Sequence, residues 1–205
     1  MKKVLFYSYG FPFQEEKKAQ KNGNSVSFTG LVRCVGYEVV SLLENNLEVI
    51  GLRSSGPDYH ESPRQLVIPG FDSIDVYDMP TWRHEFYRDE KFSQELVRKY
   101  YYEEIAEPGN PVYSDLVSRL EQIIDTENPD LILVQNLNPL LVTLHSRAND
   151  LPLVARLGNT LDLGYGNVSQ MEGVNLIEFL QRKSHHIDLT LPVSDFVRNK
   201  WSEVF

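Results

Sequence analysis

The sequence predicts an α/β fold, namely a Rossmann-like, doubly wound parallel sheet with helices on both faces. Several short runs are almost continuously apolar rather than alternating, which is typical of parallel strands covered on both sides. The segments between them carry apolar residues at steps of three and four, as amphipathic helices do. Because the two patterns alternate along the chain, right-handed strand–helix–strand units are expected.

Each predicted strand is a short apolar run followed by turn-forming residues. The five clearest runs span residues 4–7, 47–52, 131–134, 153–155 and 187–193. A weaker run at residues 73–77 is expected to form a strand near an edge of the sheet.

Helices are predicted at residues 29–46, 111–128, 139–148, 174–185 and 195–203. Ser27 or Thr29 can cap the first of these helices, and Asn46 suits the left-handed position after its end. A further helix is expected within residues 80–107, which are rich in charged and aromatic side chains. That helix could pack on the core, form an aromatic wall for a sugar acceptor, or contact a membrane surface.

Size and composition fit one globular domain over residues 1–205. The chain is 41% hydrophobic and 24% charged, and its formal net charge of −9 argues against nucleic-acid binding. The single cysteine, Cys34, excludes an intramolecular disulfide and is expected to be a small core residue. There is neither a signal-peptide pattern nor a long apolar run, so a cytoplasmic protein is expected, with peripheral membrane contact as the alternative.

Small and polar residues follow five of the predicted strands. They occupy residues 8–10, 54–56, 135–138, 158–160 and 194–195. Ligands of open parallel sheets bind beyond the carboxyl ends of the strands, so these loops predict a binding rim for a hydroxylated ligand. The alternative for any single loop is that its residues only form turns and helix caps.

Four segments together resemble the amino-terminal domain of GT-B glycosyltransferases of the glycosyltransferase 4 type. They are residues 29–49 (TGLVRCVGYEVVSLLENNLEV), 128–136 (NPDLILVQN), 151–160 (LPLVARLGNT) and 187–197 (IDLTLPVSDFV). Gly30 matches the second glycine of the family's Gly-Gly pair, and Thr29 stands in place of the first. The order and spacing of these segments cover almost the whole chain.

The resemblance implies an acceptor-binding half-enzyme that needs no metal or other cofactor. A nucleotide-sugar would be the co-substrate, held mainly by a carboxy-terminal donor-binding domain that this chain lacks. The acceptor would be a glycan, lipid-linked sugar or small molecule bound at the rim, and an uncovered apolar surface is expected where the donor domain packs. The candidate contacts are Gly10, Phe11, Thr29, Gly30, Asn136, Asn138, Arg156, Gly158, Asn159 and Ser194.

Two departures from the family limit what the resemblance implies about catalysis. Many members carry a histidine near the transferred sugar, whereas the matching stretch from Arg156 to Thr160 has none. Glu95 and Glu103 have the spacing of the donor-side Glu-x7-Glu motif, but no glycine-rich loop surrounds them. We therefore assign no catalytic residue from the sequence.

The competing hypothesis is a stand-alone α/β ligand-binding module without catalysis. The sequence contains no P-loop, dinucleotide fingerprint or Gly-x-Ser-x-Gly nucleophile elbow. His185 and His186 are adjacent on a predicted helix, which is a poor geometry for sharing one metal ion.

Overall fold

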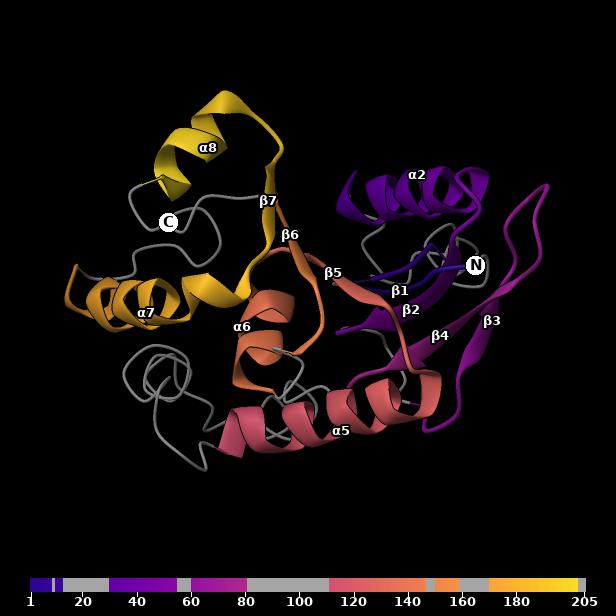
Figure 1. Ribbon diagram of the computed structural model, residues 1–205, viewed down its shortest axis with the longest axis horizontal. Coiled ribbons are helices and arrows are strands. Elements are labelled where there is room, and N and C mark those ends of the chain that lie inside the picture. The colour runs from indigo at the N-terminus through magenta and orange to yellow at the C-terminus, as the bar shows by residue number, and fades with distance from the viewer. Residues whose placement is uncertain are drawn as a thin grey trace, which may run out of the picture.

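A seven-stranded sheet forms the centre of the protein in the computed structural model (Figure 1). The structure describes residues 1–8, 10–12, 30–54, 60–80, 111–146, 150–158 and 170–202. The strand order is β3-β4-β2-β1-β5-β6-β7. The strands are β1 (Lys3–Ser8), β2 (Glu48–Arg53), β3 (Arg64–Leu66), β4 (Ile74–Asp78), β5 (Leu131–Gln135), β6 (Leu153–Leu157) and β7 (Leu189–Pro192).

Every neighbouring pair of strands is parallel except β3 and β4, which are antiparallel. The predicted α/β fold is therefore confirmed, but the sheet is mixed rather than wholly parallel. Strand β3 was missed because its three residues are too few to show an apolar period, and only pairing with β4 defines it. The strand expected at residues 73–77 is β4, which lies next to the edge strand.

The helices are α2 (Gly30–Glu44), α5 (Pro111–Glu127), α6 (Leu137–His145), α7 (Gln170–Lys183) and α8 (Asp195–Trp201), with a short 3-10 helix η3 (Ser184–His186) after α7. All five helices predicted within these ranges are present. Helix α6 starts two residues earlier than expected, because Pro139 is tolerated in the first turn, where its missing N–H is not needed.

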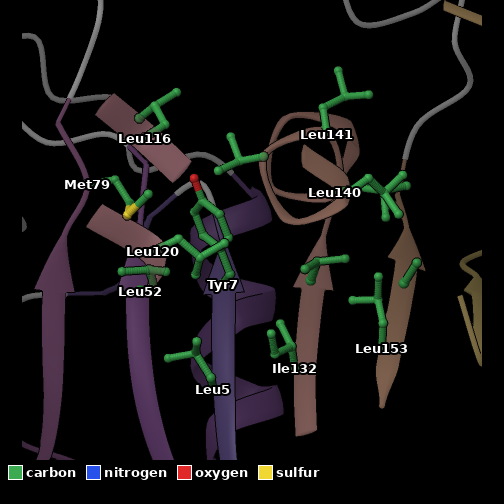
Figure 2. Packing of buried hydrophobic residues seen from close by; sticks show 14 of the residues in the cluster. Leu5, Tyr7, Leu52, Met79, Leu116, Leu120, Ile132, Leu140, Leu141 and Leu153 are labelled. Carbon is green, nitrogen blue, oxygen red and sulfur yellow. The ribbon is translucent and has the colours of Figure 1, made fainter. Parts of the chain in front are cut away.

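Helices cover both faces of the sheet, as predicted (Figure 1). On one face, Val35 and Val39 of α2 pack with Phe6 of β1 in one hydrophobic cluster. On the other face, Leu5 and Tyr7 of β1 share a larger cluster with residues of α5, α6, α7 and α8. Figure 2 shows the part of this cluster that β1 forms with α5 and α6. The alternation of β1 side chains between the two clusters explains why residues 4–7 of this strand are all apolar.

Asparagines terminate two of the helices. Asn46 has φ 57° after α2, which confirms its predicted left-handed conformation, and Asn128 has φ 48° after α5. Asparagine tolerates this region because its short polar side chain hydrogen-bonds locally.

One core prediction is wrong. Cys34 is exposed on α2, because it projects about 100° around the helix from the buried Val35 that follows it. The aromatic helix expected within residues 80–107, including Glu95 and Glu103, lies almost entirely outside the described residues. Among the residues that are described, no helix is both long and apolar enough to span a bilayer.

Candidate functional site

The strand order reverses between β1 and β5, and polar side chains gather at this point. Strand β1 pairs with β2 on one side and with β5 on the other, and all three are parallel. Their carboxyl ends therefore lie along one edge. The strand that follows β1 in sequence, β2, and the strand that follows β5, β6, lie on opposite sides of this pair. Such a switch point is where open α/β sheets bind ligands.

Four polar side chains form a continuous network here. The Ser8 hydroxyl at the end of β1 donates to Gln135 Oε1 at the end of β5, at 2.6 Å. Gln135 Nε2 in turn donates to Glu38 Oε2 on α2, at 3.3 Å. The other carboxylate oxygen, Oε1, pairs with Arg156 Nε on β6 at 2.8 Å.

The four side chains of this network are buried or largely buried, so their hydrogen bonds and charges interact with little screening by water. Ser8 and Gln135 are fully buried, whereas the side chains of Glu38 and Arg156 are 22% and 25% exposed. Desolvation raises the pKa of Glu38, and the nearby Arg156 guanidinium opposes that rise. Because both carboxylate oxygens have partners, Glu38 holds Arg156 in one orientation at the sheet edge.

Asn136 directly follows the network and has a strained backbone. Its φ of 73° and ψ of 175° lie in a region that is essentially restricted to glycine. Its Oδ1 is buried and has no hydrogen-bond partner in the described part of the chain. A Cβ added to Gly158 would lie 2.5 Å from that Oδ1, so Asn136 depends on glycine at position 158.

Of the candidate contacts, Asn136, Arg156 and Gly158 are brought together. The Asn136 N–H donates to the Arg156 carbonyl oxygen at 3.0 Å, and Gly158 lies against the Asn136 side chain. Strain, an unsatisfied buried acceptor and a partly exposed cation thus meet at one place, which is typical of a ligand-binding site.

The other candidates lie elsewhere or serve local structure. Phe11 is 1% exposed and packs edge-on against Phe6, with ring centroids 5.8 Å apart, so its side chain belongs to the core. Ser194 caps α8 by accepting a hydrogen bond from the Val197 N–H. Gly10 is buried, Gly30 begins α2, and Asn138 lies in the first turn of α6. Thr29 and Asn159 lie outside the described residues.

Sequence reasoning missed Glu38 as a member of the site. The missed signal is an acidic residue beside the apolar stripe of α2, where Val35 and Val39 face the sheet. Ser8 and Gln135 fall within predicted rim loops, but neither was singled out as a contact. Within the described ranges, no three histidine, cysteine, aspartate or glutamate side chains group as metal ligands.

A second polar cluster at the same edge is occupied by its own partners. Arg53 at the end of β2 is paired with Asp78 at the end of β4, and both side chains are buried. Asp78 also accepts from the His60 N–H at 2.9 Å. This cluster ties two strand ends together and is best explained as structural.

Comparisons with known proteins agree with this fold. No protein-family model and no curated protein sequence matches the chain. Among solved structures, Escherichia coli trehalose-6-phosphate synthase bound with UDP-2-fluoro glucose superposes with a TM-score of 0.53 at 13% identity. The match covers 98% of this chain and 42% of the other.

A second synthase shows the same relationship. The UDP-forming α,α-trehalose-phosphate synthase of Burkholderia vietnamiensis superposes with a TM-score of 0.50 at 16% identity. That match covers 100% of this chain and 42% of the other. Both proteins are GT-B glycosyltransferases, and this chain spans less than half the length of either. The chain therefore has the fold of one Rossmann-like half of a GT-B glycosyltransferase.

Proposed function

We propose that this chain is the acceptor-binding domain of a glycosyltransferase that uses a nucleotide-sugar donor. The observation that carries the proposal is the network from Ser8 through Gln135 and Glu38 to Arg156, with Asn136 beside it. It lies at the switch point of a half GT-B fold, at the sheet edge where α/β proteins bind ligands.

The chemistry available at this edge is recognition and positioning. Arg156 presents hydrogen-bond donors, and the Asn136 Oδ1 is an acceptor without a partner among the described residues. Sugar hydroxyls both donate and accept, so the pair suits a hydroxylated acceptor. Holding the acceptor against an activated donor accelerates transfer by orientation alone, and no side chain of this edge is assigned as a general base.

The proposal includes a second α/β domain that binds the donor. An apolar surface on β7 and the start of α8 supports it, formed by Leu189, Leu191, Val193 and Phe196, which are 51%, 43%, 46% and 59% exposed. Leu189 and Leu191 lie on the edge strand β7, Val193 follows that strand, and Phe196 lies in the first turn of α8. Figure 1 shows that α8 directly follows β7 at this end of the sheet. Contiguous exposed apolar surface of this kind marks an interaction site.

The test is sugar transfer by the full-length product of the gene that encodes this chain. It is incubated with a panel of uridine-, guanosine- and adenosine-diphosphate sugars and hydroxylated acceptors, and released nucleoside diphosphate is measured. We expect release that requires both a donor and an acceptor. The 205-residue chain alone is expected to transfer little or no sugar.

Two outcomes would contradict the proposal. Robust transfer by the isolated chain would show that no second domain is needed. Saturable sugar binding by the chain, without transfer by the full-length product under any donor, would instead establish a stand-alone ligand-binding module.

A further inference from the structure

We propose that the acceptor carries an oxyanion group, a phosphate or a carboxylate, and that Arg156 binds it. This inference rests on the proposed acceptor-binding function and narrows its substrate class. Arg156 interrupts the otherwise apolar strand β6, whose neighbours Ala155 and Leu157 are buried in the core. Placing a charged side chain in such a strand costs desolvation free energy, so we look for a function that Arg156 performs there.

Arg156 has unused hydrogen-bonding capacity that points to a ligand. Its Nε pairs with Glu38, and within the described part of the chain no partner accompanies its two terminal nitrogens. A guanidinium group has five N–H donors, so four have no partner among the described residues, on a side chain that is 25% exposed. Those four donors form the fork that matches two oxygens of a phosphate or carboxylate.

The hydrogen-bonded network of Ser8, Gln135 and Glu38 holds the Arg156 side chain in place. Glu38 Oε1 pairs with the Nε of the guanidinium, and Glu38 Oε2 accepts from Gln135 Nε2. Gln135 Oε1 in turn accepts from the hydroxyl of the buried Ser8. The long arginine side chain is thereby ordered before a ligand arrives, which reduces the entropy lost on binding.

Because Glu38 lies against Arg156, an anionic ligand must be recognised by hydrogen-bond geometry and not by charge alone. Glu38 neutralises Arg156, and the whole chain carries a formal charge of −9, so anions are not attracted indiscriminately. Binding must then come from paired hydrogen bonds to the fork, which a lysine ammonium cannot supply. Because the proposed acceptor is hydroxylated, the ligand class that combines hydroxyls with an oxyanion is a sugar phosphate or a sugar acid.

The experiment compares three matched probes on the chain by calorimetric titration: a hexose, its 6-phosphate and the corresponding hexuronate. We expect at least one anionic probe to bind about tenfold more tightly than the hexose, because charge-assisted hydrogen bonds are the stronger kind. Preference for the 6-phosphate over the hexuronate identifies a phosphate ligand, and the reverse preference identifies a carboxylate.

Arg156→Gln is expected to abolish the anionic preference, so that the variant binds the hexose, the 6-phosphate and the hexuronate about equally. Arg156→Lys keeps the charge, and it should lose most of the preference if the fork is what binds. Arg182→Gln removes a cation from the exposed end of α7 and is the control, expected to behave as wild type. The midpoint of thermal unfolding is measured for each variant and compared with wild type, to check that the variant is folded.

The outcomes separate this inference from the proposed function. Equal binding of all three probes, an unchanged preference in Arg156→Gln, or no binding of any probe would overturn the oxyanion site. Hexose binding without an anionic preference leaves the acceptor role intact. Conversely, an Arg156-dependent anionic preference without sugar transfer by the full-length protein would refute the glycosyltransferase role and keep the site.

Discussion

Asn136 and Gly158 show at the scale of single residues how the site is built at a cost to stability. The Asn136 backbone occupies a conformation that glycine adopts freely, and its side chain fits only because position 158 has no Cβ. Strain of this kind costs about 1–3 kcal/mol and persists where surrounding structure imposes it. We interpret the strain as the result of placing the Asn136 amide at the sheet edge.

A double-mutant cycle tests this coupling. Gly158→Ala should destabilise the chain by about 1–3 kcal/mol, since the new methyl group overlaps Asn136 Oδ1. Asn136→Gly should stabilise it by about 1 kcal/mol because the strain is relieved. In the double variant, Gly158→Ala should change the free energy of unfolding very little, because the Asn136 side chain that it would overlap is absent. Urea denaturation measures all four free energies of unfolding, and additive effects would contradict the coupling.

His145 predicts a pH dependence of stability. Its ring stacks between Tyr113 and Phe179, with centroids 4.2 and 4.6 Å away, and its Nε2 is buried without a hydrogen-bond partner in the described region. Desolvation, helped by the charge of Lys183, lowers the pKa of His145 from 6.5 to about 4. Below pH 6.5 the unfolded chain therefore binds a proton that the folded chain excludes until about pH 4.

Wild-type stability should accordingly fall as the pH drops from 6.5 towards 4. His145→Phe keeps an aromatic ring in the stack and removes the titration. Between about pH 7 and about pH 5, we expect wild type to lose about 1–2 kcal/mol more than this variant, a range reduced for partial solvent exposure. Denaturation at the two pH values measures the difference, with the exposed His185→Phe as control. Parallel pH profiles for wild type and His145→Phe would contradict the prediction.

At the scale of elements, α8 depends on its cap. Ser194 Oγ accepts the Val197 N–H at 3.2 Å, and the helix places Val197 and Trp201, 5% and 4% exposed, in the core. Ser194→Ala should therefore destabilise the chain by about 1 kcal/mol. Ser202→Ala, at the exposed end of the same helix, is the matched control for denaturation. If Ser194→Ala instead lowers ligand affinity at unchanged stability, Ser194 is a contact rather than a cap.

At the scale of the whole molecule, the apolar surface of β7 and α8 predicts association. The isolated chain should bind a hydrophobic dye or self-associate, and replacing Leu191 and Phe196 by serine should reduce both. Because these side chains are exposed, the free energy of unfolding should change by less than about 0.5 kcal/mol.

Val67→Ser is the control for that experiment, since Val67 is 63% exposed but lies beside β3, at the opposite edge of the sheet. Light scattering and dye fluorescence compare the variants. Dye binding that is unchanged by the Leu191 and Phe196 substitutions would show that this surface is not an uncovered interface.

The sequence by itself determined the secondary structure and the order of most elements. Apolar runs and helical periods are local patterns, so six of the seven strands and all five α-helices within the described residues could be predicted from them. It also located the sheet edge, because residues such as Asn136 and Gly158 directly follow strands whose parallel arrangement places their ends together.

Only the tertiary structure decided which side chains meet at that edge. Ser8 and Gln135 are 127 residues apart, and Gln135 and Glu38 are 97 apart, so no local pattern relates them. Likewise, Phe11 follows a strand, as several other candidate contacts do, and was predicted to lie at the binding rim. In the structure its ring instead packs in the core against Gly51 of β2, which has no side chain there. Periodicity reports which face of an element is buried, whereas contacts between distant elements depend on register and packing, which the folded chain alone defines.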